Sequence, residues 1–385
     1  LGIMPESVHV LASPHLYKNA AAVGVPGTGQ RGIPIAAAAG AVLDRYEDGL
    51  AILDNLDKDS LALAGQMVEE GRVKVDWREM DEILYVRVDL TAGEHSAYAV
   101  IQGDYDHVVE VGSGEEVVES AERIRREEGK DPIAAIGIDE LLPAVEALPQ
   151  EDLSFLRTYA ETNCESARRA LLDDELPFTG AAREKGFSRS EVERTAASVQ
   201  RWTGTAAEAR MAGKTLPIMA VAGSGNQGIT SLLGVLSAAE ELGSSPEATD
   251  LALAYSAAVT VFIKSRMTRL STLCGAVTAA APGVAAGVVH LIGGSHSDMV
   301  HAMQTVIGTL GGIVCDGAKE SCAYKLSMAS AFAVQAAYYA VGGAYIRGGA
   351  GIISESFDQS IRNLGRLNEL LDEVNLEMIR MISSG

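Results

Sequence analysis

The sequence predicts an α+β protein: an antiparallel β-sheet with flanking helices in the N-terminal part, then an all-helical domain rich in glycine and alanine. Residues 71–112 contain four runs in which apolar and polar residues alternate, whereas from about residue 135 onward the pattern is helical. The stretch 146–190 is the most polar of the chain. We therefore expect an α+β domain over residues 1–145 and a helical domain over residues 146–385.

The N-terminal elements follow from local patterns. Residues 7–13 alternate like a strand, residues 24–32 form a glycine-rich segment (the first glycine loop), and residues 33–50 have the composition of a helix of small residues. The four alternating runs lie at 73–77, 83–89, 96–102 and 107–111. Turn sequences separate them, which predicts an antiparallel meander with one buried face. The first strand and the helices would pack against that face.

The C-terminal part reads as helix upon helix. Asp139 and Ser190 are predicted N-caps. Residues 276–294 and 326–343 are apolar enough to raise the question of a membrane span. Small residues dominate both segments, and Pro282, His290 or Gln335 interrupts them, which favours buried helices.

Charge and cysteine content narrow the class of protein. The 385 residues carry a formal net charge of −21 and no block of Lys or Arg, which argues against nucleic acid and anionic membrane as partners. Four cysteines and the lack of a secretory signal peptide argue against a disulfide framework. We expect a cytoplasmic protein, and its apolar helices could also form a homodimer.

Residues 223–228, the second glycine loop, match the pattern G-x-G-x-x-G. A dinucleotide site would need a second strand ending in an acid about 20 residues further on. Asp250 has that distance, but the segment before it is polar and poor in strand formers. A carboxylate-binding loop is the better interpretation, and a tight turn for helix packing is the alternative. The candidate substrate-binding residues are Ser224, Gly225, Asn226 and Gln227.

A second polar segment lies near the N-terminus. Ser13, Lys18 and Asn19 precede the first glycine loop, which contains Thr28. The segment lacks the G-K-[ST] ending of a P-loop, so we do not expect it to bind nucleotide phosphates. Its polar side chains and glycine amides suit a small polar anion, and an ordinary strand-to-helix connection is the alternative.

Three of the four cysteines fall in one part of the sequence. Cys315 and Cys322 are seven residues apart, and Cys274 lies 41 residues before Cys315. Three thiolates can hold a [4Fe–4S] cluster with one open iron. The alternatives are inert thiols or a Cys₃His zinc site. The histidines in reach for zinc are His290, His296 and His301. Cys164 has no partner nearby in the sequence and is expected to be structural.

Four segments together resemble a known family: LASPHLYKNAAAVGVPGTG, VAGSGNQGI, IKSRMTRLSTLCGAV followed by AAGVVHLIGG, and CDGAKESCAYK. They are similar to the L-cysteine desulfidases, which are related to the α-portion of iron–sulfur L-serine dehydratases. The resemblance implies that Cys274, Cys315 and Cys322 are the cluster ligands and that the second glycine loop binds substrate. It also implies that Ser13, Lys18 and Asn19 contribute to the active site. A further Cys-Thr-Glu-Pro motif of that family would precede residue 1.

The resemblance implies an activity. It would be loss of the β-substituent of a small L-amino acid, without pyridoxal phosphate, with L-cysteine giving pyruvate, ammonia and sulfide. An open iron would assist the leaving group, and a base would remove the Cα proton. Lys264, Lys18 and Lys319 are candidate bases, and Lys264 is preferred because it follows an apolar run. The alternatives are an L-serine dehydratase, or a non-catalytic amino-acid-binding or redox-sensing relative.

Overall fold

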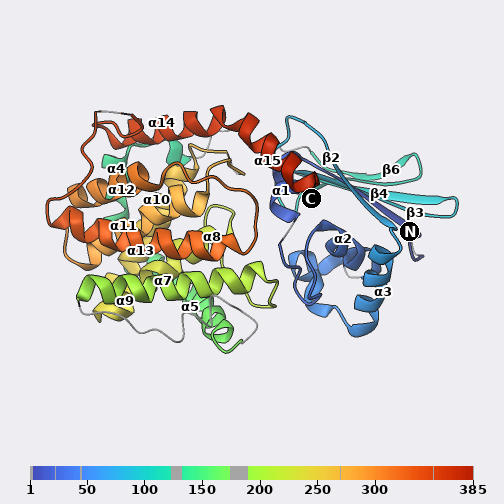
Figure 1. Ribbon diagram of the computed structural model, residues 1–385, viewed down its shortest axis with the longest axis horizontal. Helices are drawn as coiled ribbons and strands as arrows, with labels where there is room; N and C mark the ends of the chain where they lie inside the picture. Colours follow the sequence, from blue (N-terminus) through green and yellow to red (C-terminus); the bar gives the residue numbers. More distant parts are fainter. Residues whose placement is uncertain are drawn as a thin grey trace.

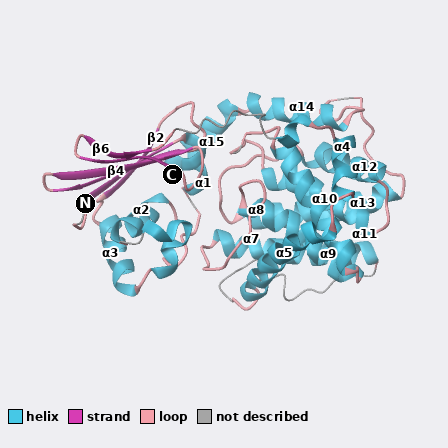
Figure 2. Ribbon diagram, turned by 180° about the vertical axis from the view of Figure 1, so that it is seen from behind, coloured by secondary structure: helices cyan, strands magenta, loops and turns pink. Residues whose placement is uncertain are grey.

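The chain forms two lobes, one around a β-sheet and one of packed helices (Figure 1). The computed structural model describes residues 3–21, 23–43, 46–122, 132–173, 190–268, 270–349 and 351–384. The α+β class predicted from the sequence is confirmed, with the sheet in the N-terminal part and helices in the C-terminal part (Figure 2).

The sheet is mixed. Its strands are β1 (Ser7–Ala12), β2 (Val73–Trp77), β3 (Tyr85–Ala92), β4 (His95–Gln102), β5 (Val108–Ser113) and β6 (Glu116–Ser120). Their order is β2-β1-β3-β4-β5-β6; β1 pairs parallel with β2, and all other pairs are antiparallel.

The meander expected from residue 73 onward is therefore wrong in its first strand. β2 does not neighbour β3, because β1 lies between them. The chain from β1 to β2 passes through helices, and such a long crossover permits parallel pairing where a short turn would not. The acidic edge strand β6 is exposed at every residue.

Two helices pack near the β2 side of the sheet. They are α2 (Ile33–Val42) and α3 (Lys58–Glu69). The predicted helix over 33–50 is too long, because α2 ends at Val42 and residues 46–55 form a 3₁₀ segment kinked at Gly49. Val8 and Val10 of β1 pack in one core with Ile35, Ala64 and Met67 of the helices.

The second lobe is built from helices with small residues at their contacts. A Cβ at Gly283 would lie 2.4 Å from the carbonyl oxygen of Ser256, and one at Gly287 would lie 2.8 Å from that of Ala252. Backbones can approach this closely only where there is no side chain. The helices are α4 (Ile138–Glu146), α5 (Gln150–Ala170), α7 (Glu191–Met211), α8 (Gly225–Gly228), α9 (Gly234–Leu242), α10 (Pro246–Lys264), α11 (Ala281–Leu291), α12 (His296–Leu310), α13 (Ser321–Val341) and α14 (Phe357–Leu370).

The helix starts test two predicted caps. Ser190 caps α7 in a reciprocal arrangement with Glu193, as expected. Asp139 is not a cap: it lies in the first turn of α4, and Gly137 holds the N-cap position. Asp358 of α14 instead accepts a hydrogen bond from the Ile138 N–H at 3.1 Å. A distant carboxylate thus takes the role that local sequence assigned to Asp139.

The apolar segments 276–294 and 326–343 form buried helices, as predicted. They contain most of α11 and α13, whose inward faces are almost fully enclosed. Among the described residues, no helix combines the length and the apolar character that crossing a membrane requires.

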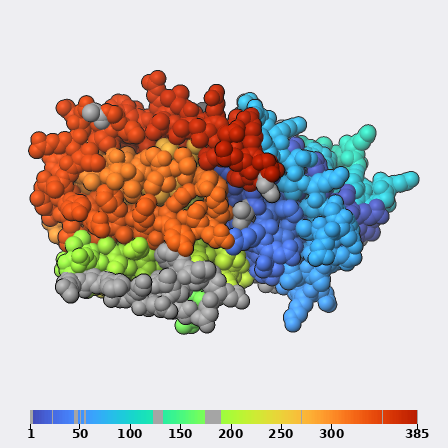
Figure 3. Space-filling model, in the orientation of Figure 1, coloured from blue at the N-terminus to red at the C-terminus, as the bar shows by residue number. Residues whose placement is uncertain are grey.

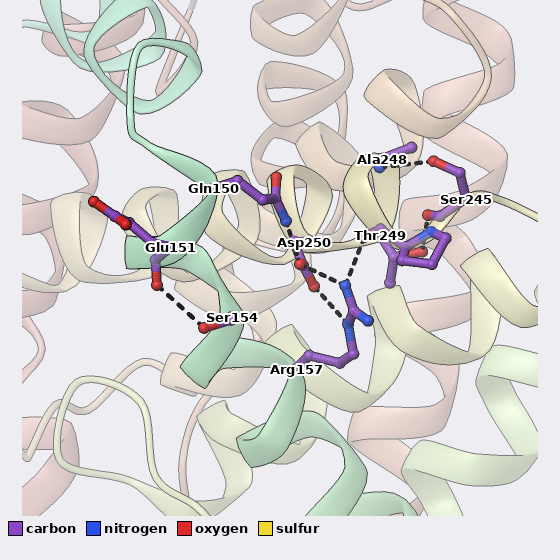
Figure 4. A network of polar contacts seen from close by, with 9 residues as sticks. Gln150, Glu151, Ser154, Arg157, Ser245, Ala248, Thr249 and Asp250 are labelled. Carbon is purple, nitrogen blue, oxygen red and sulfur yellow. Dashed lines mark hydrogen bonds and ion pairs between the residues drawn. The ribbon is translucent and has the colours of Figure 1, made fainter.

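Asp250 has a structural role. It is 1% exposed, accepts a hydrogen bond from the Arg157 Nε at 2.7 Å and bonds the side chain of Gln150 (Figure 4). These contacts join α5 to α10, and Asp250 lies in α10 rather than at the end of a second strand. The dinucleotide interpretation, already the weaker one, thereby loses its acidic residue.

The last helix, α15 (Asp372–Ser384), returns to the sheet lobe. It packs against α1 (Pro14–Ala20), and the Trp77 Nε1 donates to the Ser383 Oγ at 3.0 Å. In Figure 3 this red segment covers the upper part of the junction between the lobes. The division of the chain between residues 145 and 146 stays a prediction; the buried residues of α4 belong to the helical core.

Candidate active site at the lobe junction

The three clustered cysteines come from two segments that pair with each other. Leu273 and Val314 form an antiparallel bridge. On either side of it, the Cys274 N–H donates to the Ile313 oxygen at 2.8 Å and the Cys315 N–H to the Thr272 oxygen at 2.6 Å. Cys322 lies in the first turn of α13. This pairing brings Cys274 and Cys315 close together in space, although they are 41 residues apart in the sequence.

The three thiols affect one another electrostatically. Burial, and then the neighbouring Cys315 and Cys322, raise the pKa of Cys274 to about 12. Burial also raises the pKa of Cys322, to which Cys315 adds. Without a metal ion the two thiols keep their protons at neutral pH, so metal binding would have to displace them. Cys164 lies in α5 and is buried apart from this group.

Cationic side chains surround the thiols. Lys325 and Lys319 both bind Asp316, each at 2.6 Å. Burial alone would raise the pKa of Asp316, but these two hydrogen bonds hold it at about 2. Lys18, Lys325 and Arg210 are electrostatic neighbours of one or more of the cysteines. Such a surrounding offsets the charge of thiolate ligands.

The donor set fits an iron–sulfur cluster better than zinc. Among the described residues, no group of three or more His, Cys, Asp or Glu side chains has the geometry of a preformed metal site. The chemistry of three neighbouring thiols with cations around them nevertheless suits a cluster. The histidines weighed for zinc have other contacts: the rings of His290 and His296 lie against Tyr255, and His301 stacks on Tyr345.

The second glycine loop lies beside the cysteines. Ser224 is the N-cap of α8, and its Oγ accepts a hydrogen bond from the Gln227 N–H. A Cβ at Gly275, the residue after Cys274, would lie 2.5 Å from the Gln227 Nε2. The buried Gln227 Oε1 has no hydrogen-bond partner in the described structure. An unpaired buried acceptor at this place indicates a ligand-binding position.

Two π-helical turns flank the site. Ile229–Leu233 follows the second glycine loop, and Ala276–Ala280 follows Cys274. The two turns contact each other. Single π turns are rare and frequently mark functional sites. Both glycine-bearing segments are thus held at the junction by one packed unit.

Arg210, at the end of α7, faces the same loop. Its Nη1 donates to the Asn226 Oδ1 at 2.9 Å, and a Cβ at Gly225 would lie 2.7 Å from its Nε. Glycine at 225 is therefore required for the guanidinium to lie there. Burial lowers the pKa of Arg210, and nearby Cys322 and Tyr105 oppose the shift.

Two of the three candidate bases meet at Ser271. The Lys264 Nζ donates to the Ser271 Oγ at 2.9 Å, and the Lys18 Nζ donates to the Ser271 carbonyl oxygen at 3.4 Å. Lys18 also donates to the Asn375 Oδ1 of α15 at 2.8 Å. Burial lowers the pKa of Lys18, while Cys315 and Cys274 raise it. Lys319 lies apart from this pair, in its ion pair with Asp316.

His15 stands beside the lysine pair. Its Nδ1 lies 3.4 Å from the Asn375 Nδ2. Burial, then the charges of Lys18 and Lys264, lower its pKa to about 4, so it is neutral at pH 7. The helix α1 thus brings both a neutral imidazole and a lysine to the junction.

Three other predicted residues form hydrogen bonds within the N-terminal lobe. The Ser13 Oγ donates to the Ile83 oxygen at 2.7 Å, and the Asn19 Nδ2 donates to the His15 oxygen at 3.1 Å. The Thr28 hydroxyl donates to the Val25 oxygen at 2.8 Å and accepts from the Gln30 N–H at 3.0 Å. Asn19 and Thr28 thus hold local turns, whereas Ser13 ties the start of α1 to Ile83, and the part of all three in substrate binding stays a prediction.

Sequence reasoning missed His15, Arg210, Lys325 and Asn375. His15 stood inside the quoted segment LASPHLYKN and could have been found there. Lys325 likewise ends the quoted segment CDGAKESCAYK, whereas Arg210 and Asn375 lie in helices without a motif, and only packing brings them to the site. A pocket of about 690 Å³ elsewhere is lined by Arg266, Asp358 and other residues and contains none of the cysteines.

Comparison with known proteins places this architecture in a family. Residues 47–379 match the family described as serine dehydratase alpha chain. A UPF0597 protein of Methanocella arvoryzae is 44% identical over 384 residues, covering 98% of this chain and 90% of the relative. A UPF0597 protein of Bacteroides fragilis is 35% identical over 369 residues (95% and 86%), and the UPF0597 protein YhaM of Escherichia coli is 34% identical over 386 residues (98% and 88%). The resemblance stated from the sequence is confirmed, and the chain belongs to the serine dehydratase alpha chain family.

Proposed function

We propose that this protein is a lyase that removes the β-substituent of a small L-amino acid, and that L-cysteine is its substrate. The reaction takes L-cysteine and water to pyruvate, ammonia and hydrogen sulfide. The observation that carries the proposal is the meeting, at one junction, of three thiols, a polar glycine loop with an unpaired acceptor, and two lysines. Family membership supports a dehydratase-type elimination.

Cys274, Cys315 and Cys322 would hold a [4Fe–4S] cluster. When bound, the cluster supplies an iron that accepts the leaving sulfur as a Lewis acid. Lys325 binds the Val314 oxygen at 3.1 Å as well as Asp316, and so fixes the segment that carries Cys315. Gly317, with φ +97°, packs this segment against the backbone of Lys18.

The remaining steps fall to side chains of this chain. Ser224, Asn226 and Gln227 of the second glycine loop bind polar groups of the substrate. We assign removal of the Cα proton to the lysine pair, Lys18 and Lys264, because both reach Ser271, three residues before Cys274. Lys319 is the weaker candidate because Asp316 engages it.

Anaerobic purification followed by iron, sulfide and zinc analysis tests the metal. Sulfide release from L-cysteine, compared with pyruvate formation from L-serine, tests the substrate. Iron and sulfide in the protein, with faster turnover of L-cysteine, would support the proposal. One tightly bound zinc without sulfide would overturn the cluster assignment.

L-Serine dehydration is the second candidate, and the family description favours it. The same residues would serve, with hydroxide in place of thiol as the leaving group. Turnover of L-serine alone would select this activity. A cluster without turnover of either amino acid would instead indicate a binding or sensing relative. The cytoplasmic location and the homodimer expected from the sequence stay predictions.

A further inference from the structure

Arg210 lies at the junction, and the proposed function gives it no role. Its exposure is intermediate, and its side chain lies between the second glycine loop and Cys322. Across the described parts of the chain, its side-chain hydrogen bond is to Asn226, and no carboxylate pairs with it. A partly buried guanidinium without a counterion favours a ligand that supplies the opposite charge.

Other partly buried arginines have a structural explanation. Arg157 forms its ion pair with buried Asp250. Arg266 donates to the carbonyl oxygens of Phe262, Ala134 and Ile136 and stacks on the ring of Phe262. Their donors are used by the protein. Arg210 differs, because Asn226 takes one donor of a planar group that has five.

The surroundings of Arg210 are shaped for a ligand. Asn226 fixes the guanidinium from one side, and Gly225 offers no side chain that would cover its Nε. Cys322 and Tyr105 are its electrostatic neighbours, so the thiols and the turn between β4 and β5 both lie near it. The unpaired Gln227 oxygen lies in the same loop and could accept from an ammonium group.

We propose that Arg210 binds the α-carboxylate of the amino-acid substrate and that Asn226 orients the guanidinium for this contact. The inference rests on the proposed function and adds the group that selects α-amino acids. A carboxylate accepts two parallel hydrogen bonds from the fork of an arginine, which fixes its plane as well as its position. The Cα–H bond and the β-substituent then take defined directions relative to the lysine pair and the cysteines.

Binding of a substrate analogue tests the inference without turnover. L-Alanine has the carboxylate and the ammonium group but no leaving group, and L-alaninamide lacks the carboxylate. Isothermal titration calorimetry on anaerobically purified protein measures both. In the Arg210→Gln variant we expect L-alanine to bind about 10- to 100-fold more weakly, as for a lost charge-assisted contact. L-Alaninamide should bind the variant and the wild-type protein equally.

The chain offers a matched control. Arg201 lies on the same helix, is exposed and stacks near Trp202. Arg201→Gln makes the same charge change and should leave L-alanine binding unchanged. Asn226→Asp is a second, isosteric variant: it places a carboxylate against Arg210 and should also weaken L-alanine binding. It keeps the test valid if Arg210→Gln does not fold.

The outcomes separate this inference from the proposed function. If the wild-type protein releases sulfide from L-cysteine but Arg210→Gln binds L-alanine unchanged, the carboxylate assignment is overturned and the function stands. If the wild-type protein turns over neither amino acid, the proposed function fails, while the L-alanine titration still decides the role of Arg210. Loss of iron from Arg210→Gln with unaltered L-alanine binding would make Arg210 a counter-charge of the thiolates and would overturn the inference.

Discussion

The two glycine loops have similar compositions and opposite uses of their polar groups. In the first glycine loop, the hydroxyl of Thr28 bonds to its own turn, and Gly24 packs against the backbone of Ala212 and Gly213. In the second, the Gln227 oxygen has no partner in the described structure, and Asn226 bonds the side chain of Arg210. One loop joins the lobes, and the other leaves donors and acceptors for a ligand.

The difference shows that glycine content alone does not identify a binding loop. Glycine permits close approach of backbone to whatever lies beside it, whether that is another backbone or a substrate. At Gly24 the neighbour is the end of α7, and at Gly225 it is a guanidinium. The hydrogen bonds that are left unmade, rather than the glycines, indicate where a ligand belongs.

The largest effect is expected when one of the thiols beside the second glycine loop is removed. Cys322→Ala should remove iron and lower kcat/KM by more than about 100-fold, because a ligand is lost outright. Cys164→Ala is the control, since that residue lies in α5 and should leave iron and activity intact. Iron analysis and sulfide release measure both. Equal iron in the two variants would exclude Cys322 as a ligand.

The next prediction tests whether the first glycine loop holds the two lobes together. A Cβ at Gly24 would lie 2.3 Å from backbone atoms of Ala212 and Gly213. Gly24→Ala should therefore lower the free energy of unfolding by about 2–3 kcal/mol. Gly29 in the same loop has φ +65° and no atom within 4 Å of a Cβ, so Gly29→Ala should cost only about 1 kcal/mol of backbone strain. Urea denaturation measures both, and equal losses would contradict the close packing of the lobes.

His15, in the helix before the first glycine loop, should make the stability of the protein depend on pH. The pKa of His15 is about 4 in the folded protein against an ordinary value of 6.5, first because of burial and then because of Lys18 and Lys264. The unfolded chain therefore binds more protons below pH 6.5, and stability is lost as the pH falls toward 4. The contribution is up to about 1.4 kcal/mol per pH unit.

His15→Gln should flatten this part of the profile. Urea denaturation of both proteins between pH 4 and 6.5 gives the difference in slope. The same variant also tests whether the N-terminal lobe supplies a buried imidazole to the junction. Parallel profiles for the two proteins would mean that His15 is accessible to water.

The smallest expected effects come from one substitution in each loop. Thr28→Val should cost about 1–2 kcal/mol of stability, since it breaks two bonds of its turn, and should leave KM unchanged. Gln227→Met should leave the free energy of unfolding within about 0.5 kcal/mol, because the removed oxygen is unpaired. It should nevertheless lower kcat/KM by about tenfold. A loss of activity in Thr28→Val together with a loss of stability in Gln227→Met would mean that the first loop binds the ligand and the second loop is structural.

Much of the fold could be predicted because its patterns are local. The alternation in residues 83–111 and the helical composition after residue 135 correspond to β3–β5 and to the helical lobe. The place of β2 could not be predicted, because strand order depends on a crossover and not on alternation. Asp139 was misread as a cap because the carboxylate of Asp358 comes from 220 residues away.

Part of the candidate site could also be predicted. Cys274, Cys315 and Cys322 stand out in a chain with four cysteines, and they do lie together. The pairing of Lys18 with Lys264 at Ser271 could not be foreseen, since the contact from Lys18 spans 253 residues. Arg210 escaped notice because an arginine in a charged helix is normally solvated, and its contacts with the second glycine loop form only on folding.

By itself the sequence determined the two kinds of secondary structure, the acidic surface charge and the set of thiols, since each depends on residue type and spacing along the chain. Only the tertiary structure decided which polar groups are already satisfied. The hydroxyls of Ser13 and Thr28 bond to the backbone. In the described structure, the side-chain oxygen of Gln227 has no hydrogen-bond partner and the guanidinium of Arg210 has no carboxylate beside it. The reason is physical: a hydrogen bond forms only where folding brings donor and acceptor within about 3 Å of each other.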